Sequence, residues 1–119
     1  MEDKELLDRL EDMGAEVEDT LDRLMGDTEM YLQYLKKLPQ DKNMEELRAA
    51  VEARDKDAAM KAVHTLKGVA LNLGLLPLVD VCMDMLMDFR EDHPEEAFAQ
   101  FPEVEKTFQE WIAAIQESN

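Results

Sequence analysis

Apolar side chains recur at intervals of three or four residues along most of the chain, which is the spacing of amphipathic α-helices. We call each such row of apolar side chains a stripe. Residues that commonly begin and end helices lie between the stripes. Asp27 and Asp55 are placed to cap the helices that follow them, because an aspartate side chain accepts a hydrogen bond from an early backbone N–H. Gly26 and Gly74 are placed to end helices, and Pro39 interrupts a stripe.

The stripes organise the whole chain. They lie within residues 6–13, 17–24, 31–38, 44–51, 55–73, 77–89 and 101–115. Because no segment alternates apolar and polar residues as a half-buried strand does, the pattern predicts an all-α, antiparallel helical bundle. A length of 119 residues fits one domain. We divide it into a helical extension at residues 1–13 and the bundle at residues 14–119.

The composition and the net charge exclude a disordered chain and several classes of partner. Hydrophobic residues make up 45% of the chain, which is enough for a packed core and excludes a disordered polymer, although 35% of the residues are charged. The 13 basic and 29 acidic residues give a net charge of −16. A surface with that charge repels nucleic-acid phosphates and anionic lipids, so we expect neither nucleic acid nor a membrane as a partner.

The sequence also favours a protein that stays inside the cell. It contains no apolar run of about 18 residues, and its first five residues lack the features of a signal peptide. Cys82 is the single cysteine, so an internal disulfide is impossible, and its place on an apolar stripe predicts a buried thiol. We therefore expect a cytoplasmic protein.

The helix expected at residues 55–74 departs from the acidic character of the chain. It holds three basic and two acidic residues, a net charge of +1, whereas residues 1–54 and 75–119 carry net charges of −8 and −9. At about 100° per residue, one side of this helix is wholly apolar. His64 lies near the centre of the other side, with Lys61 and Lys67 one turn away and Gly68 directly beneath it.

A lone histidine is often a solvated bystander, but three features of this face indicate a function. A glycine in mid-helix costs about 1 kcal/mol relative to alanine, so Gly68 needs a reason. Lys67 is placed to contact an anion held on the imidazole of His64. Met60 and Leu71 add apolar surface to an otherwise polar face, as a docking site would.

These residues carry a resemblance to a known family. The stretch from His64 to Gly74, HTLKGVALNLG, resembles the signature H-x-L-K-G-x-A-x-x-x-G of histidine-containing phosphotransfer (HPt) domains. The helix order on either side is also similar, so the resemblance covers about residues 14–118 and leaves out the first helix. It implies a four-helix bundle in which His64 is phosphorylated on Nε2 and hands the group to an aspartate.

The resemblance also implies roles and partners. Lys67 would offset the charge of the phosphoryl group, and Gly68 would leave bare backbone so that a partner can approach. Helix packing and termination would be the tasks of Ala70, Asn72 and Gly74. The implied partners are a sensor histidine kinase and a response-regulator receiver domain. The receiver would bring the Mg²⁺, and this chain would hold no cofactor or metal.

One position departs from the family pattern. Many HPt domains carry Gln or Glu on the following helix beside the histidine, whereas this chain has Leu86 there. The same helix has an apolar arc wider than core packing requires, so the arc is either a broad core stripe or a docking surface that borders His64. In the second interpretation the docking residues are Met60, Leu71, Met83, Leu86, Met87 and Arg90.

Other classes of protein fit less well. A carboxylate-bridged metal site in a bundle needs Glu-x-x-His, but Lys61 and Arg90 stand three residues before His64 and His93. Neither glycine-rich phosphate loop of a kinase is present, so we expect a phosphoryl carrier rather than an enzyme with ATP chemistry. Two alternatives stay open: a helical adaptor that keeps the fold without the chemistry, and a phosphorylatable domain of the chemotaxis-kinase type.

Overall fold

The computed structural model describes residues 3–117 and shows an all-α chain, as the sequence predicts. That range contains eight α-helices and one short 3₁₀-helix, η1. Their bounds are α1 Asp3–Asp12, α2 Val17–Arg23, α3 Thr28–Lys37, η1 Leu38–Gln40, α4 Lys42–Glu52, α5 Lys56–Asn72, α6 Leu76–Arg90, α7 Pro94–Ala99 and α8 Phe101–Gln116. No helix within residues 3–117 is long and apolar enough to cross a membrane.

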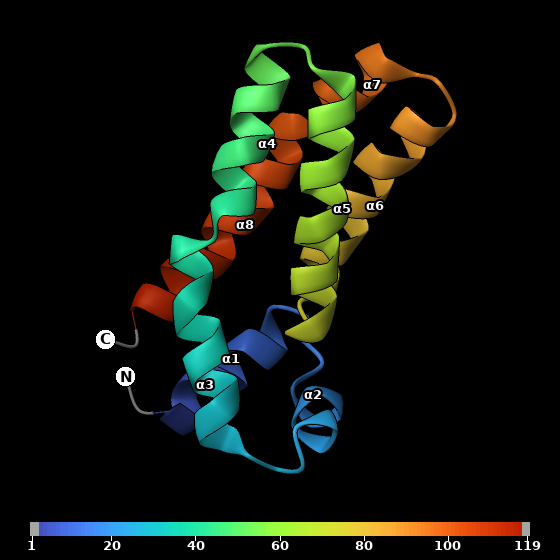
Figure 1. Cartoon of the computed structure of the whole chain (residues 1–119). Coiled ribbons are helices and arrows are strands. Elements are labelled where there is room, and N and C mark those ends of the chain that lie inside the picture. The colour runs from blue at the N-terminus through green and yellow to red at the C-terminus, as the bar shows by residue number, and fades with distance from the viewer. Residues whose placement is uncertain (1–2, 118–119) are drawn as a thin grey trace.

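The helices α4, α5, α6 and α8 run alternately up and down and form a four-helix bundle (Figure 1). α3 lies end to end with α4, with η1 between them, and extends the molecule beyond the end of α5 (Figure 1). The fold is therefore elongated, with dimensions of 42 × 24 × 20 Å. α1 and α2 lie at one end of the bundle and α7 at the other (Figure 1).

Short-range interactions set the ends of the helices. The side chain of Asp27 accepts a hydrogen bond of 3.0 Å from the backbone N–H of Met30, and that of Asp55 accepts one of 3.1 Å from Ala58. Pro39 lies in η1, where its missing N–H and fixed φ interrupt the α-helix. The predicted caps and the predicted break are confirmed.

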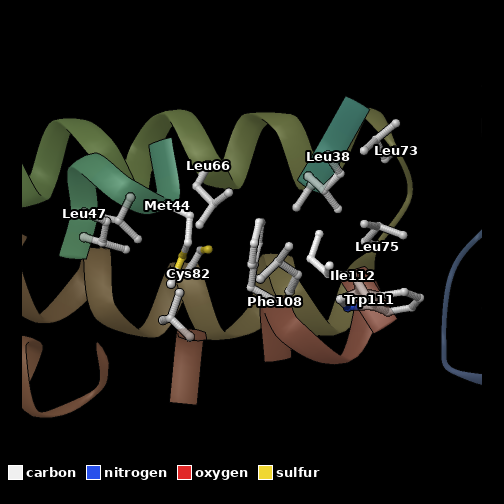
Figure 2. Close-up of a cluster of buried hydrophobic side chains, with 14 of the residues drawn as sticks. Leu38, Met44, Leu47, Leu66, Leu73, Leu75, Cys82, Phe108, Trp111 and Ile112 are labelled. Atoms are coloured by element: carbon white, nitrogen blue, oxygen red, sulfur yellow. The ribbon is translucent and has the colours of Figure 1, made fainter. Parts of the chain in front are cut away.

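The hydrophobic core fills the space between the long helices, and Figure 2 shows side chains of α4, α5, α6 and α8 pointing into this common interior. Trp111, Tyr31 and Phe89 are the largest of the fully buried side chains. Cys82 is 0% exposed, which confirms the predicted buried thiol. Burial of these apolar groups is the main favourable contribution to the stability of the bundle.

α1 packs into the same core. Leu6 and Leu10 are both 0% exposed, and Arg9 pairs with Glu117, which directly follows α8. Because a surface ion pair of this kind contributes little, the two leucines supply most of the attachment of α1 to the bundle. The segment expected as an N-terminal extension is therefore part of the packed structure.

The end of α5 is fixed at Gly74, the residue expected to terminate this helix. Gly74 has φ +74°, a left-handed conformation that glycine adopts without strain. A Cβ at this position would lie 2.2 Å from Oγ1 of Thr20 in α2. The backbone N–H of Glu16 also donates a hydrogen bond of 2.8 Å to the carbonyl oxygen of Gly74. These close approaches hold the end of α5 against the segment that leads into α2.

Candidate functional site

α5 presents two chemically different sides, as the helical wheel predicts. The residues that it buries in the bundle are Ala59, Ala62, Val63, Leu66 and Ala70. His64 is exposed on the outer side, close to the middle of the 17 residues of α5. Because helix ends fray and helix centres do not, this placement holds the imidazole on a rigid surface.

Gly68 lies one turn after His64 and leaves an open space on the same side of α5. A Cβ built at Gly68 would meet no atom of residues 3–117 within 4 Å, apart from the local helix backbone. Gly68 therefore differs from Gly74, where a Cβ would collide with Thr20. Packing within the described chain gives no reason for glycine at position 68, although glycine costs the helix about 1 kcal/mol.

Two lysines flank His64. Lys61 is exposed, whereas Lys67 is half-buried. Burial raises the pKa of the Cys82 thiol to about 12, and the charge of Lys67 opposes this shift in part. Neither lysine forms an ion pair with a carboxylate of residues 3–117. Both charges are therefore available to an anion on the outer side of α5.

The apolar surface expected around His64 consists of side chains from α5 and α6. Leu71 is 45% exposed and Met87 is 41% exposed. Met60 and Met83 are half-buried, and Arg90 is exposed at the end of α6. These five residues offer surface to a partner.

The expectation for Leu86 needs correction. Its side chain is only 2% exposed and belongs to the hydrophobic core, so it offers almost no surface to a partner. Its neighbour Met87 is the exposed residue of this part of α6. The core interpretation of the apolar arc therefore holds for Leu86, and the docking interpretation is left with the other five residues.

Comparison with known protein families identifies the chain. The family model of the Hpt domain matches residues 4–118, which is nearly the whole sequence. The chain belongs to the Hpt domain family. Hpt domains are four-helix bundles that act in histidine phosphotransfer within phosphorelays. No curated protein and no solved structure matches the chain. The family match begins at residue 4 and so includes α1, which the signature alone leaves outside the resemblance.

In this Hpt domain the imidazole of His64 makes no hydrogen bond with any of residues 3–117. Leu86, at the position where the resemblance leads us to expect a polar partner for the ring, is buried among apolar side chains. The chain itself therefore does not select which ring nitrogen carries the proton. Solvent or a bound partner sets the tautomer.

Other reactive side chains of the Hpt domain lie apart from His64. His93 is exposed in the turn between α6 and α7. Cys82 is buried, and its raised pKa keeps the thiol protonated and unreactive near neutral pH. Within residues 3–117, no three His, Cys, Asp or Glu side chains gather as metal ligands would.

Proposed function

We propose that this Hpt domain carries a phosphoryl group on Nε2 of His64 and exchanges it with the aspartate of a response-regulator receiver domain. The observation that carries the proposal is the open space at Gly68, one turn from an exposed imidazole. A glycine that lowers helix stability without serving internal packing is explained if a partner's active site approaches the helix backbone here. A sensor histidine kinase would supply the phosphoryl group to the relay.

The chemistry needs a neutral imidazole, because only an unprotonated ring nitrogen has a lone pair for attack. Nε2 of His64 attacks the phosphorus of phosphoaspartate. The P–N bond forms as the P–O bond breaks, and the aspartate leaves as a carboxylate. The reverse reaction passes the group onward to another aspartate. Mg²⁺ on the receiver would offset the charge on the transferring oxygens, so this chain needs no metal of its own.

Lys61 and Lys67 favour the phosphorylated form of His64. Phosphorylation adds a charge of about −2, and it does so on the one segment of the chain whose net charge is positive. At contact distance, a charge pair near a protein surface contributes about 1–4 kcal/mol before salt screens it. Lys67 is half-buried and is therefore screened less than the exposed Lys61.

The receiver would dock on a surface made of Met60, Leu71, Met83, Met87 and Arg90, which we call the docking surface. A receiver's phosphorylation site is itself rich in carboxylates, so most of a chain of charge −16 would repel it. The net charge of +1 over residues 55–74 removes that repulsion locally. Methionine side chains suit such a contact, because they adapt to partners of different shape.

A second candidate function is that of a helical adaptor that binds relay partners without chemistry. Leu86, in place of the polar partner found in other members, favours it. The two candidates differ in what happens when the protein is incubated with purified phosphorylated receivers from the same source. A phosphoryl carrier takes the label from its cognate receiver, whereas an adaptor binds the receiver and gains no label. A domain of the chemotaxis-kinase type would instead take its label from the ATP-binding domain of such a kinase.

A further inference from the structure

A groove opens where α2, α3 and the end of α5 meet, away from the exposed imidazole. Its volume is about 460 Å³, which lies within the range of about 300–1,000 Å³ that small-molecule sites occupy. The residues that line it are Arg23, Leu24, Tyr34, Lys37, Val69, Asn72 and Leu73. Val69 and Asn72 follow His64 by five and eight residues, or about 8 and 12 Å along the helix axis, so the groove lies beyond the imidazole toward the end of α5.

The lining combines an apolar floor with two cations. Leu24, Val69 and Leu73 supply the aliphatic surface, and Tyr34 adds an aromatic ring that is 43% exposed. Arg23 and Lys37 are the charged residues of the lining, and no carboxylate is among the lining residues. In a chain with 29 acidic and 13 basic residues, a groove of this charge is unusual.

The guanidinium of Arg23 is held in place at the edge of the groove. One of its nitrogens donates to Oγ1 of Thr20 at 3.1 Å and to the carbonyl oxygen of Leu71 at 3.3 Å. Both acceptors are uncharged, so the positive charge is not neutralised. A guanidinium has five N–H donors, and these two bonds leave others for a ligand.

Neither cation of the groove has an acidic partner. Among the described residues, Arg23 and Lys37 form no ion pair with Asp or Glu, whereas Arg9, Arg48, Arg54 and Lys56 each do. The groove therefore has positive charge that no carboxylate of the described residues neutralises. An anion with an apolar body would complement both the charge and the aliphatic floor.

Hydrogen-bond donors cover two carbonyl groups at the end of α5, next to the groove. The carbonyl groups at the end of a helix carry partial negative charge, which repels anions when they are free. Here the carbonyl oxygen of Leu71 accepts from Arg23 and from the backbone N–H of Gly74, and that of Leu73 accepts from the hydroxyl of Tyr31 at 2.8 Å. These donors offset the charge of the helix end.

We propose that this groove binds a small organic anion that has an aromatic or branched aliphatic body and a single acidic group. The body lies on Leu24, Val69 and Leu73, beside the ring of Tyr34, and the acidic group lies between Arg23 and Lys37. Because the groove includes the last turn of the helix that carries His64, such a ligand would contact α5 without covering the imidazole.

Anilinonaphthalene sulfonate is a suitable probe, since it has a flat aromatic body with one sulfonate. Phenylnaphthylamine, which has the same ring system without the sulfonate, is the matched neutral probe. We expect saturable binding of the sulfonate at one site, followed by fluorescence, and weaker binding of the neutral probe. The near-ultraviolet circular dichroism of Trp111 and Tyr31 should stay unchanged. A loss of that signal, equal binding of the two probes, or no saturable binding would overturn the proposal.

A pair of neighbouring lysines provides the control. Lys37 lines the groove, whereas Lys36 is exposed on the same helix and is not part of the lining. Lys37→Ala should weaken binding of the sulfonate by about three- to tenfold, and Lys36→Ala, with the same loss of charge, by less than about twofold. Val69→Glu, which places a carboxylate in the groove, should weaken binding of the sulfonate more than Lys37→Ala does. Equal losses in the two lysine variants would show non-specific attraction and would contradict a site.

Discussion

The hydroxyl of Tyr31 donates a hydrogen bond of 2.8 Å to the carbonyl oxygen of Leu73, and this bond joins α3 to the end of the helix that carries His64. Tyr31 is 0% exposed, and burial raises the pKa of its hydroxyl. Together with the close approach of Gly74 to Thr20, the bond fixes the far end of α5. His64 is thus presented from a helix that the rest of the fold holds in place.

Replacing Tyr31 tests that attachment. Tyr31→Phe keeps the ring and removes the donor, so the buried carbonyl of Leu73 loses its partner, and the free energy of unfolding should fall by about 1–2 kcal/mol. Urea unfolding followed by far-ultraviolet circular dichroism measures the change. Tyr34→Phe is the matched control, because Tyr34 is 43% exposed, and it should change stability by less than about 0.5 kcal/mol. Equal effects of the two substitutions would contradict the assigned bond.

The Cys82 thiol should make the stability of the protein depend on alkaline pH. Its pKa is raised from 9.0 to about 12 in the folded chain, chiefly by burial, so the unfolded chain loses this proton first. The contribution is fully present below about pH 9 and is lost as the pH rises toward 12. Over that interval the free energy of unfolding should decrease by up to about 1.4 kcal/mol per pH unit from this group.

Comparison with Cys82→Ala isolates the thiol from the other groups that titrate at high pH, Tyr31 among them. The variant should be less stable at every pH because a buried side chain has been shortened, but its stability should fall less steeply above pH 9. Urea unfolding at intervals across this range measures both slopes. Parallel slopes for the two proteins would show that the thiol ionises as readily in the folded state as in the unfolded one.

The ends of the helices could be predicted from the sequence because their causes are local. Asp27 and Asp55 each accept a hydrogen bond from a backbone N–H three residues later, and Pro39 interrupts a helix through its own ring. The exposure of His64 could also be predicted, because it depends only on how charged and apolar residues are distributed around a single helix. Gly68 was recognisable as a candidate because a mid-helix glycine needs a reason.

Features that depend on packing between helices could not be predicted in this way. Leu86 lies on a broad apolar arc of α6, and only the neighbouring helices determine which part of that arc is buried. Leu6 and Leu10 form a stripe that any amphipathic helix can have, and nothing in it indicates that the stripe is covered by the bundle. The groove could not be predicted for the same reason, since its lining combines the neighbouring helices α2 and α3 with the end of α5, which lies much further along the chain.

Glycine at position 68 should lower the stability of the protein and leave room for the receiver to approach the helix. Gly68→Ala introduces a methyl group into open space on a regular helix, so it should raise the free energy of unfolding by up to about 1 kcal/mol. Gly68→Gln should also fold, but its longer side chain should slow phosphate exchange with the receiver. Thermal unfolding and a time course of label transfer measure the two effects.

Gly74→Ala is the contrasting variant. It forces a φ of +74° on a residue with a Cβ and creates a collision at 2.2 Å with Thr20, so it should lower stability. If Gly68→Gln exchanged phosphate at the normal rate, the partner would not approach the helix at this point. If Gly68→Ala were destabilised as strongly as Gly74→Ala, glycine at position 68 would have a packing role.

The docking surface should be apolar at its centre. Met83→Glu places a charge in the contact and should weaken binding of the cognate receiver by about tenfold or more. Met25→Glu is a matched control outside the docking surface, since Met25 is 95% exposed in the turn between α2 and α3. Binding to the wild-type protein should depend only weakly on salt, because burial of apolar area does not depend on ionic strength. A steep salt dependence, or equal losses for the two variants, would place the contact elsewhere.

Locating the phosphoryl group tests the central claim most directly. The protein is labelled by its phosphorylated cognate receiver, and the label is then followed in acid, in alkali and in two variants. A phosphoramidate on His64 predicts a label that is lost in acid and kept in alkali. It also predicts that His64→Gln abolishes labelling with unchanged helical content, whereas His93→Gln labels normally. Labelling that persists in His64→Gln, or a label that survives acid, would contradict phosphotransfer through His64.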